Sequence, residues 1–141
     1  MTMSPGTLFR FWFEEVWNKR AADLIPAYFA EDGVAYALDA AGGDAHGPEA
    51  FRAFFETFHD NFSDVEFTVH DVLENGDWAA GRWTCRLTHS GDGFGAPATG
   101  ETLTVSGMTM MRAADGKILE GWNEWDRLKL ATTCRMVGAV A

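Results

Sequence analysis

The sequence has few cysteines, few basic residues and no long hydrophobic run. Its 141 residues include only Cys85 and Cys134, too few for a disulfide-stabilised scaffold, and no CxxC pair. Eleven Lys and Arg against 21 Asp and Glu give a net charge of -10, so a nucleic-acid or anionic-membrane partner is not expected. Without a bilayer-length apolar run or a signal-peptide layout, we expect a cytoplasmic protein.

Several catalytic motifs are also missing from the sequence. There is no phosphate loop, no GxGxxG, no HExxH and no GxSxG, which argues against nucleotide-binding, zinc-protease and serine-hydrolase chemistry. The four histidines do not fall at ligand spacing with one another or with the cysteines, so no metal site is expected.

Large aromatic residues are what the sequence has in excess. Eleven Phe and six Trp give more bulky apolar surface than a small core needs, and the hydrophobic fraction of 47% is typical of a packed globule. The length is that of one ordinary domain, so we expect residues 1–141 to form a single domain.

The hydrophobic periodicity changes from helical in the first half to alternating in the second. Helices are predicted over 7–20, from Asp23 to 32–33 and from Pro48 to Phe62, and a short strand over 34–38. Long strands are predicted from Asp64 to Leu73, over 78–89, 101–112 and 117–126, followed by a tail helix over 127–137. This order predicts an α+β domain, a curved antiparallel sheet covered on one face by helices.

His89 is a candidate proton donor because of its place in the predicted strand over 78–89. It ends the apolar face that Trp83, Cys85 and Leu87 begin. An imidazole at the mouth of an apolar cavity can exchange protons near neutral pH. The alternative is a histidine at a strand end that hydrogen-bonds the following loop.

The last predicted strand supplies a candidate base, Asp126. Alternation places it on one face with Ile118 and Trp122, and places Leu119, Asn123 and Trp125 on the other. A carboxylate beside an indole ring is poorly solvated and therefore suited to acid–base work. Alternatively, Asp126 caps the tail helix that begins near Arg127.

Other residues are candidates for contacting a ligand. Asn123 can donate to a substrate carbonyl and stabilise enolate charge, or satisfy a local backbone group. Met108 and Thr109 lie in a methionine-rich stretch that is either plain core or an adaptable wall for a flat hydrophobic ligand. Trp83 is a candidate for the cavity wall, and Trp122 is a candidate for positioning the ligand. Tyr36 could supply a phenol hydroxyl as a donor.

The ordered segments 47–52, 58–64, 88–91, 97–100, 106–109 and 116–126 together resemble the SnoaL-like polyketide cyclases of the nuclear transport factor 2-like superfamily. The resemblance implies a cystatin-like cone, with the bent sheet and N-terminal helices around a deep apolar pocket, and a homodimer. It also implies cyclisation by acid–base residues without a cofactor. His89 matches the family's pocket histidine, and Asp126 matches the acidic end of its last-strand motif.

The chain differs at one place from many of these cyclases and at another from the related epoxide hydrolases. Many cyclases carry an acidic residue near the position of Thr109 or Asn123. The epoxide hydrolases of the same superfamily need Arg and Asp two apart on one strand, whereas Arg86 is followed by Thr88.

These observations predict a cofactor-independent enzyme that cyclises or isomerises a hydrophobic carbonyl compound. Asp126 would be the base, His89 the acid or its partner, and Asn123 and Trp122 the positioning groups. The alternatives are a non-catalytic ligand-binding dimer of the same fold, and an epoxide hydrolase.

Overall fold

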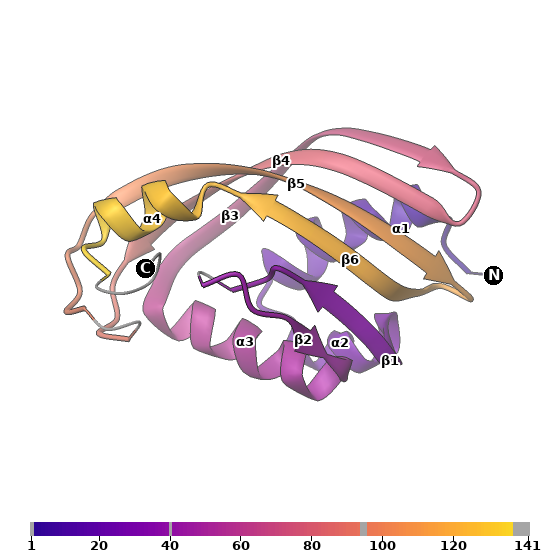
Figure 1. Ribbon diagram of the computed structural model, residues 1–141, viewed down its shortest axis with the longest axis horizontal. Helices are drawn as coiled ribbons and strands as arrows, with labels where there is room; N and C mark the ends of the chain where they lie inside the picture. The colour runs from indigo at the N-terminus through magenta and orange to yellow at the C-terminus, as the bar shows by residue number, and fades with distance from the viewer. Residues whose placement is uncertain (1, 40, 94–95, 137–141) are drawn as a thin grey trace.

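Short helices precede a long antiparallel meander in the computed structural model, which describes residues 2–39, 41–93 and 96–136 (Figure 1). The helices are α1 Pro5–Phe11, the π-helical turn η1 Trp12–Trp17, the 3-10 turn η2 Ala22–Leu24, α2 Ile25–Tyr28, α3 Gly47–Asn61 and α4 Arg127–Thr133. The strands are β1 Phe29–Tyr36, β2 Ala45–His46, β3 Phe62–Asn75, β4 Trp78–His89, β5 Thr102–Ala114 and β6 Lys117–Trp125. Val137, where the predicted tail helix ends, lies outside the described residues.

The strands form one six-stranded sheet in the order β2-β1-β6-β5-β4-β3. All neighbouring strands are antiparallel except β1 and β6, which are parallel. In Figure 1, α1 lies behind the sheet and α3 runs along its lower edge, so the sheet has one covered and one open face. The α+β prediction is confirmed, and the sheet is mostly rather than wholly antiparallel.

The first helical segment changes its winding at Trp12. Ser4 caps α1 by accepting the Thr7 N–H, and the chain then widens into η1. A π-helical turn has more residues per turn than an α-helix, so Trp12, Phe13 and Trp17 are all buried on the sheet side. The predicted helix over 7–20 is therefore shorter and less regular than 3.6-residue spacing implied.

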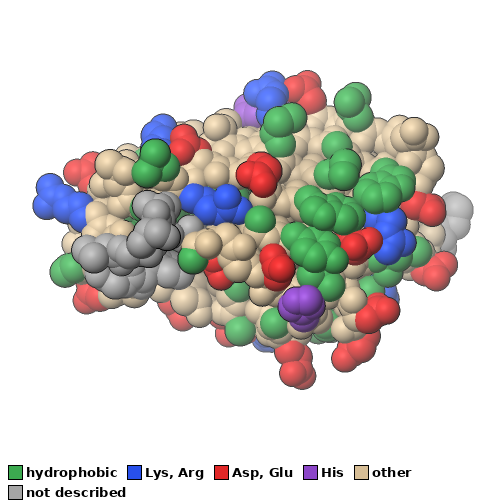
Figure 2. Space-filling model, in the orientation of Figure 1, with side chains coloured by type: hydrophobic (Ala, Val, Ile, Leu, Met, Phe, Trp, Pro, Cys, Tyr) green, Lys and Arg blue, Asp and Glu red, His purple; other side chains and the backbone are tan. Residues whose placement is uncertain are grey.

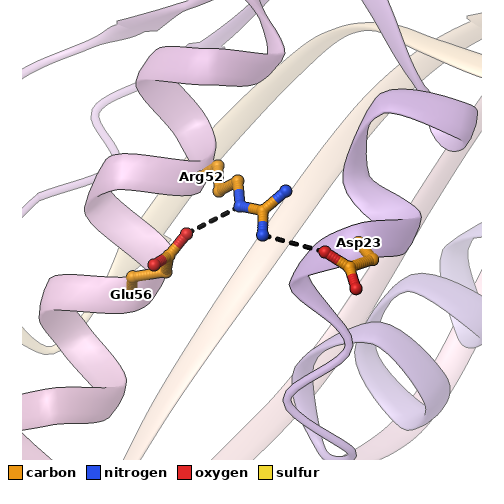
Figure 3. Close-up of polar contacts among 3 residues, drawn as sticks. All are labelled: Asp23, Arg52 and Glu56. Carbon is orange, nitrogen blue, oxygen red and sulfur yellow. Dashed lines mark hydrogen bonds and ion pairs between the residues drawn. The ribbon is translucent and has the colours of Figure 1, made fainter.

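Two side chains fix the helices against their neighbours. Asn18 donates to the Phe67 carbonyl (2.9 Å) and accepts the Phe67 N–H (2.6 Å), which joins the end of η1 to β3. Arg52 of α3 bridges Glu56 and Asp23 (Figure 3), at 2.7 and 2.8 Å. Asp23, where the second helix was predicted to begin, lies within η2 and pairs with this arginine.

The second predicted helix ends earlier than expected. It ends at Tyr28, and β1 begins at Phe29 and continues through the Asp32-Gly33 pair that was expected to end the helix. The register with β6 shifts between Phe29 and Val34, and a Cβ at Gly33 would lie 2.8 Å from the Phe29 ring. Glycine therefore permits the close packing of this irregular strand.

A β-bulge at Leu119 decides which side chains of β6 face inward. Ala113 pairs with Ile118, whereas Arg112 pairs with Glu120, so Leu119 is an extra residue in β6. Beyond the bulge, Asn123 and Trp125 line the helix-covered face. The predicted grouping of Ile118 with Trp122 and Asp126 is wrong because the bulge reverses the alternation.

Among the helices in the described ranges, none has the length and apolar character needed to cross a membrane.

Candidate functional site

An apolar pocket lies between the helices and the covered face of the sheet. Its wall consists mainly of aromatic and aliphatic side chains: Trp12, Phe13, Trp17, Phe29, Ala35, Leu38, Phe51, Phe54, Phe58, Phe67, Trp83, Cys85, Val105, Thr109, Met111, Ile118, Gly121, Asn123 and Trp125. The cavity volume is about 70 Å³. Typical small-molecule sites hold roughly 300–1,000 Å³, so a multi-ring ligand requires wall side chains to move.

Packed aromatic rings shape the pocket wall. Trp17 lies 4.6 Å from Phe55 and 5.3 Å from Phe67, measured between ring centroids. Phe13 and Phe67 in turn contact Trp83 at 5.8 and 5.0 Å. The tilted and edge-on geometries are the favourable ones for aromatic pairs, so the rings stabilise one another around the cavity.

A directed line of hydrogen bonds crosses the floor of the pocket. The Trp83 indole N–H donates to the Thr109 hydroxyl (3.0 Å), and that hydroxyl donates to Asn123 Oδ1 (2.9 Å). Asn123 Nδ2 donates to the Tyr36 carbonyl (3.0 Å). An indole N–H can only donate and a carbonyl can only accept, so these two ends fix the orientation of the Asn123 amide.

The Asn123 amide keeps one free hydrogen-bond donor. Nδ2 carries two hydrogens, and its one hydrogen bond within the described part of the chain goes to Tyr36. Asn123 is partly exposed and lines the pocket. The second N–H is therefore available to a ligand acceptor such as a carbonyl oxygen.

Charged and acid–base side chains are missing from the described wall of the pocket. None of its residues is Asp, Glu, His, Lys, Arg or Tyr. The Cys85 thiol is the one lining group whose pKa is perturbed, and burial raises it to about 12. Cys85 is therefore a neutral thiol near neutral pH and a weak nucleophile.

His89 is fully buried beyond the pocket, where its ring packs on Phe62 with a centroid distance of 5.5 Å. Its Nδ1 accepts the Thr99 N–H (3.3 Å) and lies 3.1 Å from the Thr99 hydroxyl, so the ring hydrogen is on Nε2. Nε2 is buried without a hydrogen-bond partner in the described structure. Burial lowers the pKa of His89. This placement matches the alternative in which His89 bonds the following loop.

Asp126 lies at the end of β6, where its carboxylate accepts the Lys129 N–H at 3.0 Å and caps α4. The side chain is exposed and is not among the pocket residues. The poor solvation that made it a candidate base is therefore not found, and its position matches the capping alternative. His89 and Asp126 do not meet in the pocket.

Three predicted ligand contacts lie on the open face of the sheet. Trp122 stacks between Tyr36 and Trp78, with centroid distances of 5.3 and 5.6 Å. The Tyr36 hydroxyl donates to Glu120 (3.0 Å), which raises the pKa of Tyr36. Met108 is 61% exposed. Trp122, Tyr36 and Met108, which were predicted as ligand contacts, are thus not among the described pocket residues, whereas Trp83, Thr109 and Asn123 line the pocket together.

Apart from Asn123, the sequence interpretation missed the residues at the mouth of the pocket. The lining residues that are only partly buried are Leu38, Phe54, Asn123 and Trp125. Trp125 donates its indole N–H to the Leu38 carbonyl at 3.3 Å. Phe54 shares the apolar stripe of α3 and could have been found from that periodicity, but Leu38 carried no signal of its own.

Residues 2–39, 41–93 and 96–136 contain no group of three or more His, Cys, Asp or Glu side chains that could hold a metal ion.

Comparison with known proteins places this fold and pocket in context. A model of the SnoaL-like polyketide cyclase family matches residues 7–133. No sequence among the curated proteins matches the chain.

Solved structures match over almost the whole length. IdmH from Streptomyces antibioticus, described as a candidate polyketide cyclase, is 26% identical, with a TM-score of 0.77 over 92% of this chain and 97% of that one. A candidate SnoaL-like cyclase from Jannaschia sp. CCS1 is 20% identical, with a TM-score of 0.81 over 95% and 96%. AclR from Streptomyces galilaeus, described as a candidate hydroxylase, is 21% identical, with a TM-score of 0.78 over 95% and 88%. Because one scaffold carries both descriptions, the fold does not specify the reaction.

Proposed function

The chain belongs to the SnoaL-like polyketide cyclase family, and from this premise we propose that it binds a hydrophobic, carbonyl-bearing small molecule and cyclises or isomerises it without a cofactor. The apolar pocket favours such a molecule because aromatic walls exclude water from it. The reaction begins with loss of a proton from the carbon beside the carbonyl, which gives an enolate.

The free N–H of Asn123 is the observation that carries this proposal. A ligand carbonyl that accepts this hydrogen bond gains negative charge on its oxygen as the enolate forms, and the bond strengthens with that charge. The amide does not need to reorient, because Thr109 and the Tyr36 carbonyl already hold it. Asn123 would thus act as a neutral oxyanion donor near a position where related cyclases carry an acid.

The mechanism also needs a proton acceptor and a proton donor. We propose Asp126 as the base and His89 as the acid, on the family match alone, since neither side chain is among the pocket residues. Solvent water that enters with the ligand is the competing proton acceptor. A variant pair distinguishes the two, because Asp126→Asn and His89→Gln remove only the protein groups.

Deuterium wash-in tests the proposal without knowledge of the natural substrate. The protein is incubated in D2O with aromatic ketones such as 2-acetonaphthone, and mass spectrometry follows deuterium at the carbon beside the carbonyl. We expect the wild type to accelerate exchange and Asn123→Leu to lose roughly 10²-fold or more of the rate. Full activity in Asn123→Leu would contradict the oxyanion role, and full activity in Asp126→Asn and His89→Gln would contradict theirs.

A non-catalytic ligand-binding protein is the second candidate function. The observation that favours it is the described pocket wall, which contains no charged or acid–base side chain other than the neutral Cys85 thiol. Ketone binding without any acceleration of deuterium exchange would support this candidate over the enzyme. The position of Arg86 argues against epoxide hydrolysis, because this side chain is exposed on the opposite side of β4 from the pocket residue Cys85.

We also propose that the protein forms a homodimer through the open face of the sheet. Hydrophobic side chains gather there over β5 and β6 (Figure 2), and Trp78, Met108 and Met110 are 39%, 61% and 44% exposed. A two-fold interface is self-complementary, so one apolar patch serves both copies. Light scattering should give twice the 15.5 kDa chain mass, and Met110→Glu should give the monomer. A monomeric wild type would refute the proposal.

A further inference from the structure

The Arg127 side chain joins three parts of the structure near the end of β6. Its Nε donates to the Asp39 carbonyl (3.0 Å), and its Nη2 donates to the carbonyls of Ala37 (2.5 Å) and Asn123 (3.4 Å). The guanidinium carbon lies 5.4 Å from the centre of the Trp125 ring. These contacts hold the cation in one place even though the side chain is partly exposed.

The contacts of Arg127 coincide with the mouth of the apolar pocket. Asn123 and Trp125 are partly exposed lining residues, and Ala37 and Asp39 flank a third, Leu38. A ligand that protrudes from the pocket past Trp125 therefore lies beside the guanidinium.

No carboxylate in the described part of the chain neutralises the positive charge of Arg127. Arg127 forms no ion pair with any carboxylate of the described residues, and its Nη1 makes no hydrogen bond there. The nearby carboxylates are otherwise engaged: Asp39 accepts the N–H groups of Ala41 and Gly43, and Asp44 accepts that of Ala37. An unneutralised cation at a pocket mouth is notable in a chain of net charge -10.

We propose that Arg127 forms an anion subsite at the pocket mouth, and that the ligand carries a carboxylate at the end that protrudes from the pocket. The free Nη1 donates to this carboxylate while the apolar body of the ligand lies against the aromatic wall. This inference rests on the proposed function, because it places the anion on the same ligand whose carbonyl Asn123 binds.

A matched ligand pair tests the subsite. 4-Acetylbenzoate carries both a ketone and a carboxylate on one ring, and its methyl ester keeps the ketone but has no charge. Trp83 and Trp125 line the pocket, so tryptophan fluorescence reports binding of either compound. We expect the wild type to bind the acid about 5-fold more tightly than the ester at low salt. Added NaCl at 0.5 M should reduce this preference because it screens exposed charges.

Three variants distinguish the effect of the charge at Arg127 from the effect of the protein's overall charge. Arg127→Gln should bring the acid-to-ester preference to about 1, and Arg127→Lys, which keeps the charge, should retain most of it. Arg86→Gln is the matched control, because Arg86 is exposed on the far side of β4 and forms no ion pair with a described residue. It should keep the wild-type preference.

The preference, rather than either affinity, is the measured result, so a general loosening of the mouth in Arg127→Gln does not imitate loss of the subsite. Equal binding of acid and ester by the wild type, or an unchanged preference in Arg127→Gln, would overturn the subsite and leave the pocket proposal intact. Failure of both compounds to bind would overturn the proposed ligand class and the subsite with it.

Discussion

Thr109→Val removes the central hydroxyl of the hydrogen-bond line while keeping the shape of the side chain. Thr109 is 7% exposed and Trp83 is 5% exposed, so bulk water has little access to the indole N–H once its partner is lost. An unsatisfied buried donor costs about 1–3 kcal/mol, and the lost bond to Asn123 adds about 1 kcal/mol. The new methyl group gains about 0.8 kcal/mol from burial, so the free energy of unfolding should fall by about 2 kcal/mol.

Urea denaturation followed by tryptophan fluorescence measures this loss of unfolding free energy. A loss of this size should also lower Tm by roughly 6–8 °C. Thr104→Val is the matched control on the same strand, because Thr104 is exposed and its hydroxyl makes no described hydrogen bond, and it should stay within about 0.5 kcal/mol of the wild type. In a Trp83→Phe background, Thr109→Val should cost about 1 kcal/mol less, since the donor is gone. Equal stabilities of Thr109→Val and Thr104→Val would refute the buried hydrogen-bond line.

Other substitutions probe the packing around the pocket and the charges on the helices. Burial lowers the pKa of His59 from 6.5 to about 4, so the folded state favours the neutral ring. Because the unfolded chain binds the proton first, the free energy of unfolding should fall by about 2–3 kcal/mol between pH 6.5 and 4, as measured in urea titrations. His59→Phe should make the free energy of unfolding depend less on pH over this range. Gly107→Ala should lower the free energy of unfolding by about 2 kcal/mol or more in the same assay, because the new Cβ would overlap the Trp83 ring. At Gly121 a new Cβ meets nothing within 4 Å and enters the pocket, so Gly121→Ala should weaken ketone binding at unchanged stability. Arg52→Gln should cost no more than about 1 kcal/mol, since its ion pairs are exposed; a larger loss would contradict this.

Regular elements of the fold were predictable from the sequence because their signals are local. Pro48 lies in the first turn of α3, and the phenylalanine spacing that follows it gives the helix's buried face. The strand from Trp78 to His89 follows an Asn-Gly turn, and its strict alternation placed Trp83 and Cys85 on one face, where the pocket contains both.

The irregular elements were not predictable from periodicity. A regular hairpin that continues the pairing of Ala114 with Lys117 would place Thr109 opposite Trp122, but the extra Leu119 moves it opposite Asn123. The contact between Thr109 and Asn123 therefore depends on a one-residue bulge that alternation does not reveal.

Acid–base candidates present a different difficulty, because one residue type fits two roles. An Asp before a helix is both a typical cap and a candidate base, and Asp126 forms the cap. His89 at the end of an apolar strand face is buried against Thr99 beneath the following loop. Local sequence does not distinguish these roles, because the distance of each side chain from the pocket depends on tertiary packing.

The side-chain amide of Asn123 gives the most direct test of the pocket as a carbonyl-binding site. Two-dimensional ¹H–¹⁵N NMR of the labelled 15.5 kDa protein resolves the two amide hydrogens and the Trp83 indole N–H during titration with 2-acetonaphthone. We predict that one Asn123 hydrogen, the one not donated to Tyr36, moves strongly downfield as the ketone saturates the site. Saturable ketone binding that leaves both Asn123 hydrogens unshifted would contradict the account.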